Sequence, residues 1–423
     1  MPLIFVLLVR VSAGFLLAGI SEKAPGGLLE MAQECQLRAE KVRQLKAKKP
    51  IRWKVSSRDG ILEYVKKTLD KQYAPGELEA EGLFAKALGL IPGDLEYGSF
   101  MLELMQEQIG GVYDPFEETF RLANWLAPAV QEGVIVHEVT HALQDQHFNI
   151  DSFLERIENN SDFMLARSAV AEGDATLVML VDSLEKSQAG ISLEDLAQNF
   201  SAMDRMINLS MVAFPSFGKA PKAIRETLVF PYIQGLYFVM AAKKRGGWEA
   251  VNRLYGKLPR STEQVLHPER YFDDYDQPTE VQFPEVKKLV GDEWQEIYND
   301  VLGEFTIRLL LADLGEEEAT RAADGWDGDR TWAWRNGDRL AWHMLSVWDS
   351  EKDAVEFSAA MASLVHKKYG EYVADPLSGK PMMSWTKSDG EKILVERRNQ
   401  RVLVVCGLPG KIVERLRQLL PSP

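Results

Sequence analysis

The stretch from His137 to His141 constrains this chain most, because it sets two histidines and a glutamate in the pattern H-E-x-x-H. It follows the apolar run Val134–Val136 and contains neither Pro nor Gly, which predicts a helix. Residues four apart share one face of a helix, so both imidazoles can bind one metal ion. Glu138 then lies where its carboxylate can deprotonate a water that zinc has acidified. The pattern predicts a zinc hydrolase with Glu138 as the general base. The competing interpretation is a surface helix with two incidental histidines.

A catalytic zinc site needs a third protein ligand, and two residues compete for that position. His147 has the spacing of the metzincin pattern H-E-x-x-H-x-x-G-x-x-H, but Gln144 stands where that pattern has a Gly that turns the chain. Glu172 lies on a second predicted helix among small and apolar neighbours, which indicates an acid on a buried face. A Glu on a second helix completes the site of thermolysin-like enzymes, the gluzincins. The sequence therefore favours Glu172, with a metzincin-type site that uses His147 as the alternative.

Thermolysin-like sites usually also carry an Asp four residues after the ligating Glu, where it orients a ligating His. This chain has Thr176 at that position. Asp174 is a candidate replacement, although it does not share a helix face with position 176.

Several longer strings resemble a group of bacterial gluzincin-like proteins. They are His137–Phe148, Ala171–Ala175, the hairpin segment Gly111–Pro115 and the segment Ser261–Pro268. The resemblance implies a Zn²⁺ cofactor bound by His137, His141 and Glu172, with Glu138 as the base. We therefore expect a zinc metallopeptidase that hydrolyses a peptide or protein substrate. The alternative is a zincin-like binding or scaffolding protein without turnover.

Peptide hydrolysis also needs a donor for the developing oxyanion. His267 precedes Pro268 in a helix-breaking segment, so we expect it on a loop where it can face a cleft. Tyr232 and Tyr271 are the other candidates.

A hairpin is expected just before the motif helix, with strands at Gly111–Tyr113 and Thr119–Ala123. In the zincin plan an edge strand pairs with an extended peptide substrate. Thr119–Asn124 is the candidate for that strand, and an ordinary core hairpin is the alternative.

The pattern of apolar residues changes from helical to alternating beyond Asp324, which predicts an α+β protein with two folded parts. Residues 22–320 are expected to form a mostly helical zincin-like catalytic domain with a small edge hairpin. Residues 325–423 are expected to form a Trp-rich α+β domain with an antiparallel sheet. It would contain a hairpin turning at Asn336-Gly337, a helix over 351–368, and strands at 382–386, 392–397 and 401–406. Its tryptophans are expected to pack the sheet.

The formal net charge of −14 argues against nucleic acid as a partner, because no excess of Lys and Arg exists to neutralise phosphates. Residues 1–21 are largely apolar and are a candidate signal peptide, interrupted by Arg10. We expect an exported protein, in the periplasm, the cell envelope or the medium, with a cytoplasmic location as the alternative. The apolar part after Arg10 is too short to span a bilayer, so no stable membrane span is expected.

Overall fold

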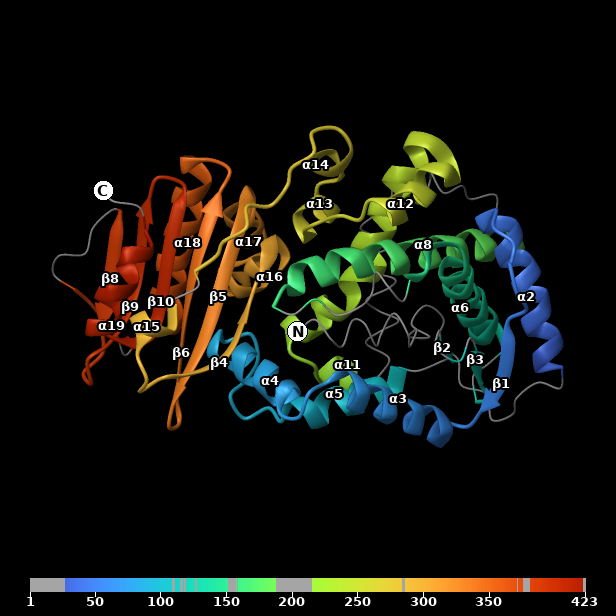
Figure 1. Ribbon diagram of the computed structural model, residues 1–423, viewed down its shortest axis with the longest axis horizontal. Coiled ribbons are helices and arrows are strands. Elements are labelled where there is room, and N and C mark those ends of the chain that lie inside the picture. The colour runs from blue at the N-terminus through green and yellow to red at the C-terminus, as the bar shows by residue number, and fades with distance from the viewer. Residues whose placement is uncertain are drawn as a thin grey trace. The chain divides into compact units, whose positions relative to one another are not determined.

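The protein is α+β, as the sequence predicts, and its elements are drawn in Figure 1. The computed structural model describes residues 27–108, 111–114, 117, 119–125, 128–150, 157, 159–187, 215–283, 286–370, 372–375 and 381–420. The candidate signal peptide lies outside these residues and stays a prediction. None of the helices in the described ranges is long and apolar enough to cross a membrane.

The chain divides into two compact units, each built from more than one segment. Unit 1 comprises residues 1–76, 96–156 and 164–259. Unit 2 comprises residues 77–95, 157–163 and 260–423. The domain boundary predicted between residues 320 and 325 stays a prediction.

Unit 1 is mostly helical. Its long helices are α2 (Leu28–Arg43), α3 (Arg58–Gln72), α5 (Tyr97–Gln108), α6 (Pro128–Phe148), most of α8 (Ser161–Ser187) and α12 (Lys222–Gly256). The H-E-x-x-H motif lies in the middle of α6, as predicted, and the following α8 carries Glu172. A short helix, α11 (Pro215–Lys219), precedes α12.

Helices α8 and α12 touch through their backbones at two glycines. A Cβ atom added at Gly173 would lie 2.2 Å from the backbone of Gly235, and one added at Gly235 would lie 2.2 Å from the carbonyl oxygen of Ala169. Only residues without a side chain permit this approach. Gly173 follows Glu172 directly, so this close contact with α12 sets the position of the α8 turn that carries Glu172.

The small sheet of unit 1 corrects one prediction. Its strand order is β1 (Arg52–Ser56), β3 (Thr119–Ala123), β2 (Gly111–Asp114). The predicted hairpin is present as the antiparallel pair β2–β3, but β1 pairs with the other side of β3 in parallel. The strand at Thr119–Asn124 is therefore central and cannot be the edge that receives a peptide. The edge strand beside the motif helix is β2.

Unit 2 is built on a seven-stranded sheet with the order β4-β5-β6-β10-β9-β8-β7, in which every pairing is antiparallel. The strands are β4 (Gln295–Asp300), β5 (Trp326–Asn336), β6 (Arg339–Trp348), β7 (Val373–Ala374), β8 (Met382–Thr386), β9 (Glu391–Arg398) and β10 (Arg401–Pro409). The helices are α4 (Glu77–Ala87), α13 (Thr262–Leu266), α14 (Pro268–Phe272), α15 (Val286–Val290), α16 (Gly303–Leu310), α17 (Glu316–Ala323), α18 (Glu351–Lys368) and α19 (Gly410–Leu416). The predicted hairpin, helix and three further strands are confirmed, whereas β4 and β7 were not predicted.

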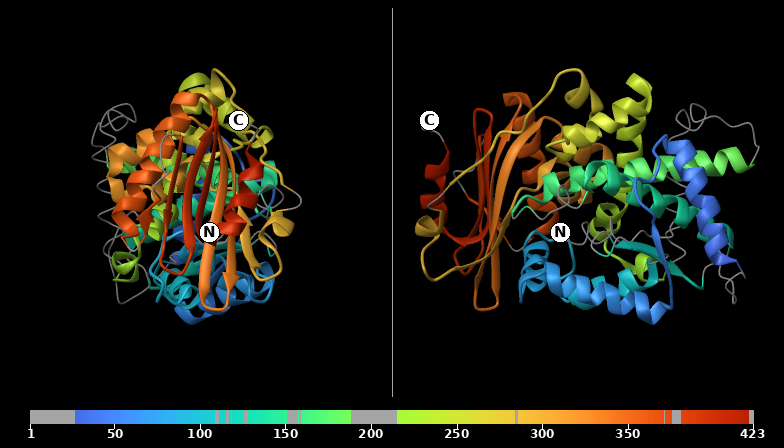
Figure 2. Two further views of the ribbon diagram at one scale, coloured as in Figure 1. Left: turned by 90° about the vertical axis from the view of Figure 1, so that its left-hand side faces the viewer. Right: turned by 45° about the vertical axis from the view of Figure 1, so that its right-hand side comes forward.

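Both faces of this sheet are covered by helices, which can be followed in Figure 2. Alternate residues along one strand point to opposite faces, so Ala333 packs with α16, α17 and α18, while Trp332 and Trp334 pack with α15 and α19. The six tryptophans between 326 and 385 are no more than 6% exposed. The prediction that they pack the sheet is confirmed.

His343 of β6 is a buried structural residue of the same sheet. Its ring stacks on Trp332 at 4.8 Å between centroids and accepts a hydrogen bond from Nε1 of Trp334 at 2.9 Å. Burial lowers the pKa of His343 to about 3, so this imidazole is neutral at physiological pH.

Candidate metal centre

Helix α6 brings the two motif histidines to one face, and α8 brings Glu172 against them. Nε2 of His137 lies 3.0 Å from Oε2 of Glu172 and 3.1 Å from Nε2 of His141. Nε2 of His141 lies 3.6 Å from the same Glu172 oxygen. The exposed fractions of these side chains do not exceed 5%. Three potential ligand atoms from two helices therefore converge on one buried point.

The spacing of these three atoms fits a zinc ion. Two ligands at about 2.0–2.1 Å from a tetrahedral zinc lie about 3.3–3.4 Å apart, and the three observed separations scatter around that value. The donor set of two imidazoles and one carboxylate is also the one found in thermolysin-type sites. Oε1 of Glu172 is buried and has no hydrogen-bond partner among the described residues, so no hydrogen bond competes for its lone pairs.

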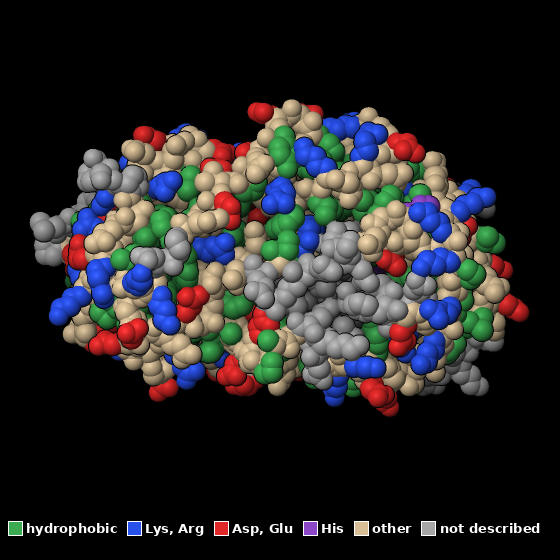
Figure 3. All heavy atoms as spheres, in the orientation of Figure 1, with side chains coloured by type: hydrophobic (Ala, Val, Ile, Leu, Met, Phe, Trp, Pro, Cys, Tyr) green, Lys and Arg blue, Asp and Glu red, His purple; other side chains and the backbone are tan. Residues whose placement is uncertain are grey.

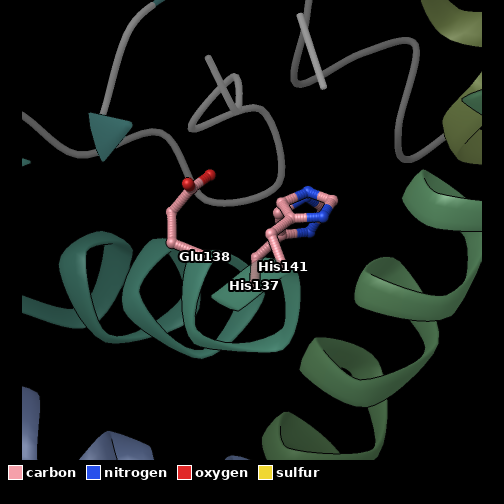
Figure 4. A group of neighbouring side chains, drawn as sticks. All are labelled: His137, Glu138 and His141. Atoms are coloured by element: carbon pink, nitrogen blue, oxygen red, sulfur yellow. The ribbon is translucent and has the colours of Figure 1, made fainter. Parts of the chain in front are cut away.

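Glu138 lies to one side of the imidazole pair (Figure 4). One of its carboxylate oxygens comes within 4.8 Å of a ring nitrogen of each histidine. Its Oε2 accepts a hydrogen bond of 2.7 Å from the backbone N–H of Tyr113 in β2. The Tyr113 hydroxyl in turn donates to Asp145 of α6 at 3.2 Å. Strand β2 thus fixes the position of Glu138 beside the three converging atoms.

The charges of this buried group are coupled. Burial disfavours the imidazolium of His141, but the nearby carboxylates of Glu172 and Glu138 outweigh it and raise the pKa of His141 to about 9. Burial also disfavours the Glu172 carboxylate, but the two histidines outweigh it and lower the pKa of Glu172. Without metal, a proton on His141 therefore neutralises Glu172 at pH 7.

This coupling gives a first expected result. A histidine binds a metal ion only as the neutral imidazole. Zinc binding at pH 7 should therefore displace the proton from His141 and release it to the buffer. The pKa of about 9 means that His141 should release near one proton per zinc at pH 7 and none well above pH 9. A zinc-bound water would add a proton of its own, in a fraction that rises with pH, so the total release should fall across this range without reaching zero. Calorimetric titration with zinc in buffers of different ionisation enthalpy measures it. A release independent of pH between 7 and 10 would contradict it.

The alternative third ligand, His147, sits at the end of α6 with its Nε2 2.7 Å from the carbonyl oxygen of Lys46. That contact is exposed, in contrast to the buried position of Glu172. The absence of a turn at Gln144 leaves α6 continuous to Phe148. Of the two candidates, the described structure brings Glu172 to the motif histidines.

The candidate oxyanion donors lie in different units. The Tyr232 ring belongs to unit 1 and lies beside His137, with ring centroids 6.0 Å apart. His267 and Tyr271 belong to unit 2. Nε2 of His267 lies 3.0 Å from Oε1 of Glu304 and 3.3 Å from Nη2 of Arg308. The role predicted for His267 stays a prediction.

Among the described residues of unit 2, two further groups of side chains could bind a metal ion: His267, Glu304 and Asp324 in one, and Glu263, Asp276 and Asp349 in the other. An arginine already contacts the carboxylates of each group. Arg308 pairs with Glu304 in the first, and Arg270 pairs with Glu263, and with Asp349 at 2.7 Å, in the second. These guanidinium groups supply the positive charge that a metal would bring.

Comparison with known proteins adds little to this geometry. A family model described as a domain of unknown function, DUF8575, matches residues 289–417, which lie in unit 2. No curated protein matches the chain. The fold shows a likeness to a protein from Chloroflexus aurantiacus described as "a putative hydrolase with a novel fold". The two are 18% identical with a TM-score of 0.38, over 60% of this chain and 90% of that one. A likeness at this level carries no functional argument.

Proposed function

We propose that this protein is a zinc metallopeptidase of gluzincin type. The observation that carries the proposal is the convergence of His137 Nε2, His141 Nε2 and Glu172 Oε2, at mutual separations of 3.0–3.6 Å, around one buried point. Bound there, zinc would lower the pKa of a water and polarise the substrate carbonyl.

The side chains around that point would have different catalytic roles. Glu138, held by the Tyr113 N–H, would take the proton of the attacking water and return it to the leaving amine. Tyr232, whose ring lies beside His137, is the candidate donor to the oxyanion in unit 1.

The charge distribution on one face of the molecule gives no support to a nucleic-acid substrate. On the face drawn in Figure 3, Lys and Arg side chains are interspersed with Asp and Glu. A polyanion would need a continuous basic patch.

The choice of third ligand gives the second expected result, which tests the proposal. Glu172→Gln should lose most bound zinc, because an amide oxygen replaces a charged ligand. His147→Gln should keep a full equivalent, because that side chain contacts Lys46. Zinc is measured by atomic emission after gel filtration, and cleavage of fluorescein-labelled casein is followed with and without chelator. Zinc lost in His147→Gln but retained in Glu172→Gln would overturn the gluzincin assignment, and a wild type without zinc would overturn the proposal.

A zinc-binding protein without turnover is the second candidate, and one observation favours it. The residues His137, Glu138, His141 and Glu172 are at most 4% exposed, whereas a catalytic zinc must admit substrate. A full equivalent of zinc together with no cleavage of casein or of a mixed peptide library would select this alternative.

A further inference from the structure

We propose that Gln144 is a positioning residue that fixes the tautomer of His141, and that Asp174 holds Gln144 in place for this role. The inference rests on the proposed zinc site and assigns how that site is oriented. It is carried by a chain of polar contacts that runs from α6 through α8 to α2.

The direction of the Gln144 amide follows from its contacts with α8. Its Nε2 lies 3.0 Å from the carbonyl oxygen of Ala171 and 3.2 Å from Oδ2 of Asp174. Both neighbours can only accept hydrogen bonds, so the amide nitrogen must face them. The flipped amide would set its oxygen against two acceptors in a site where Gln144 is 0% exposed.

The Gln144 oxygen then determines where the proton of His141 lies. Oε1 of Gln144 is 2.9 Å from Nδ1 of His141. An amide oxygen only accepts, so Nδ1 must carry the hydrogen. In the neutral imidazole the lone pair is then on Nε2. Nε2 is the atom that faces His137 and Glu172, at 3.1 and 3.6 Å.

Asp174 is held in place from its other side by two groups of unit 1. The Tyr255 hydroxyl donates to Oδ2 of Asp174 at 2.7 Å. Nε of Arg43 forms an ion pair with Oδ1 at 2.7 Å, and both side chains of this pair are 0% exposed. Arg43 also donates to Asn252 at 2.9 Å, and its guanidinium lies 4.6 Å from the centre of the Trp248 ring. These contacts restrict the movement of the Asp174 carboxylate that accepts from Gln144.

The same chain of contacts explains how the site can work without an Asp at position 176. Oγ1 of Thr176 is buried and has no hydrogen-bond partner among the described residues, so it does not orient a histidine. The orienting acceptor comes instead from α6 itself, one turn after His141, and α8 contributes Asp174 behind it. Partners of this kind typically change metal affinity 10–100-fold when removed.

Three variants on α6 test the inference. Gln144→Met removes both the acceptor for His141 and the donor to α8. Gln144→Glu keeps an acceptor for Nδ1 but sets its second oxygen against Ala171 and Asp174. Gln146→Met is the matched control, because the Gln146 side chain accepts from the N–H groups of Lys48 and Lys49 and donates to the carbonyl oxygen of Lys49. Zinc dissociation constants are measured at pH 7.5 by competition with a chromogenic chelator, and thermal unfolding of the metal-free proteins is followed by circular dichroism.

The expected pattern separates orientation from stability. Gln144→Met should weaken zinc binding by about 10–100-fold. Gln144→Glu should bind zinc within a few-fold of wild type although it melts at a lower temperature, and Gln146→Met should leave zinc affinity unchanged. Wild-type affinity in Gln144→Met would overturn the positioning role alone. A zinc affinity that falls in parallel with the melting temperature across all three variants would also overturn the positioning role. A wild type that binds no zinc would overturn the proposed function together with the inference.

Discussion

Replacing Glu138 with Gln is expected to lower the turnover number for casein by about 10²–10⁴-fold, the usual contribution of a general base. The zinc content should not change, because Glu138 lies beside the three converging ligand atoms and is not one of them. Gln keeps a carbonyl oxygen for the hydrogen bond from the Tyr113 N–H, so the variant should fold like the wild type. Activity, zinc content and the circular dichroism spectrum are measured on the same preparation.

The matched control for this variant is Glu132→Gln, the same substitution on the same helix. Glu132 pairs with Arg38 at 2.9 Å and with Lys186, and it lies more than a turn before the motif. Its replacement should cost about 0–1 kcal/mol of stability and leave turnover unchanged. Equal turnover of Glu138→Gln and wild type would rule out Glu138 as the general base.

The sequence predicted the parts of the site that depend on local periodicity. Two histidines four residues apart must share a face of α6, and an acid among small residues of α8 must face the core. A single Gln within a helical pattern carries no such signal. Gln144 was noticed because it replaces a turn-making Gly, whereas its contacts with Asp174 depend on how α6 and α8 pack.

In the fold, too, the elements that depend on neighbouring residues were predictable and a non-local strand pairing was not. In unit 2, alternating residues and the Asn336-Gly337 turn predict the β5–β6 hairpin from neighbouring residues alone. The strand β1 is short and pairs with β3, from which it is separated in the chain by α3, α4, α5 and β2. Such a non-local parallel pairing leaves no periodic signal, and missing it made a central strand look like an edge strand.

Removing the positive charge of the buried Arg43–Asp174 pair is expected to destabilise unit 1 strongly. Arg43→Met leaves the Asp174 carboxylate fully buried without its ion-pair partner, and breaking such a pair costs about 3–5 kcal/mol. The double variant Arg43→Met, Asp174→Asn should recover part of this loss, because no uncompensated charge then remains. We expect an interaction free energy between Arg43 and Asp174 of about 0.5–3 kcal/mol from this double-mutant cycle. Urea unfolding is measured at pH 7 with chelator present, so that zinc binding does not add to the stability.

Arg38→Met supplies the control, since it is the same substitution on the same helix at a more exposed position. The Arg38 side chain is 27% exposed and pairs with Asp182 at 2.8 Å, so its loss should cost less than the loss of the fully buried Arg43. A similar loss in Arg38→Met and Arg43→Met would mean that burial of the pair is not what makes Arg43 important. A double variant no more stable than Arg43→Met would mean that the guanidinium acts through its contact with Trp248 rather than through its charge. A double variant more stable than Arg43→Met would instead show that Arg43 stabilises unit 1 by neutralising the buried Asp174 carboxylate.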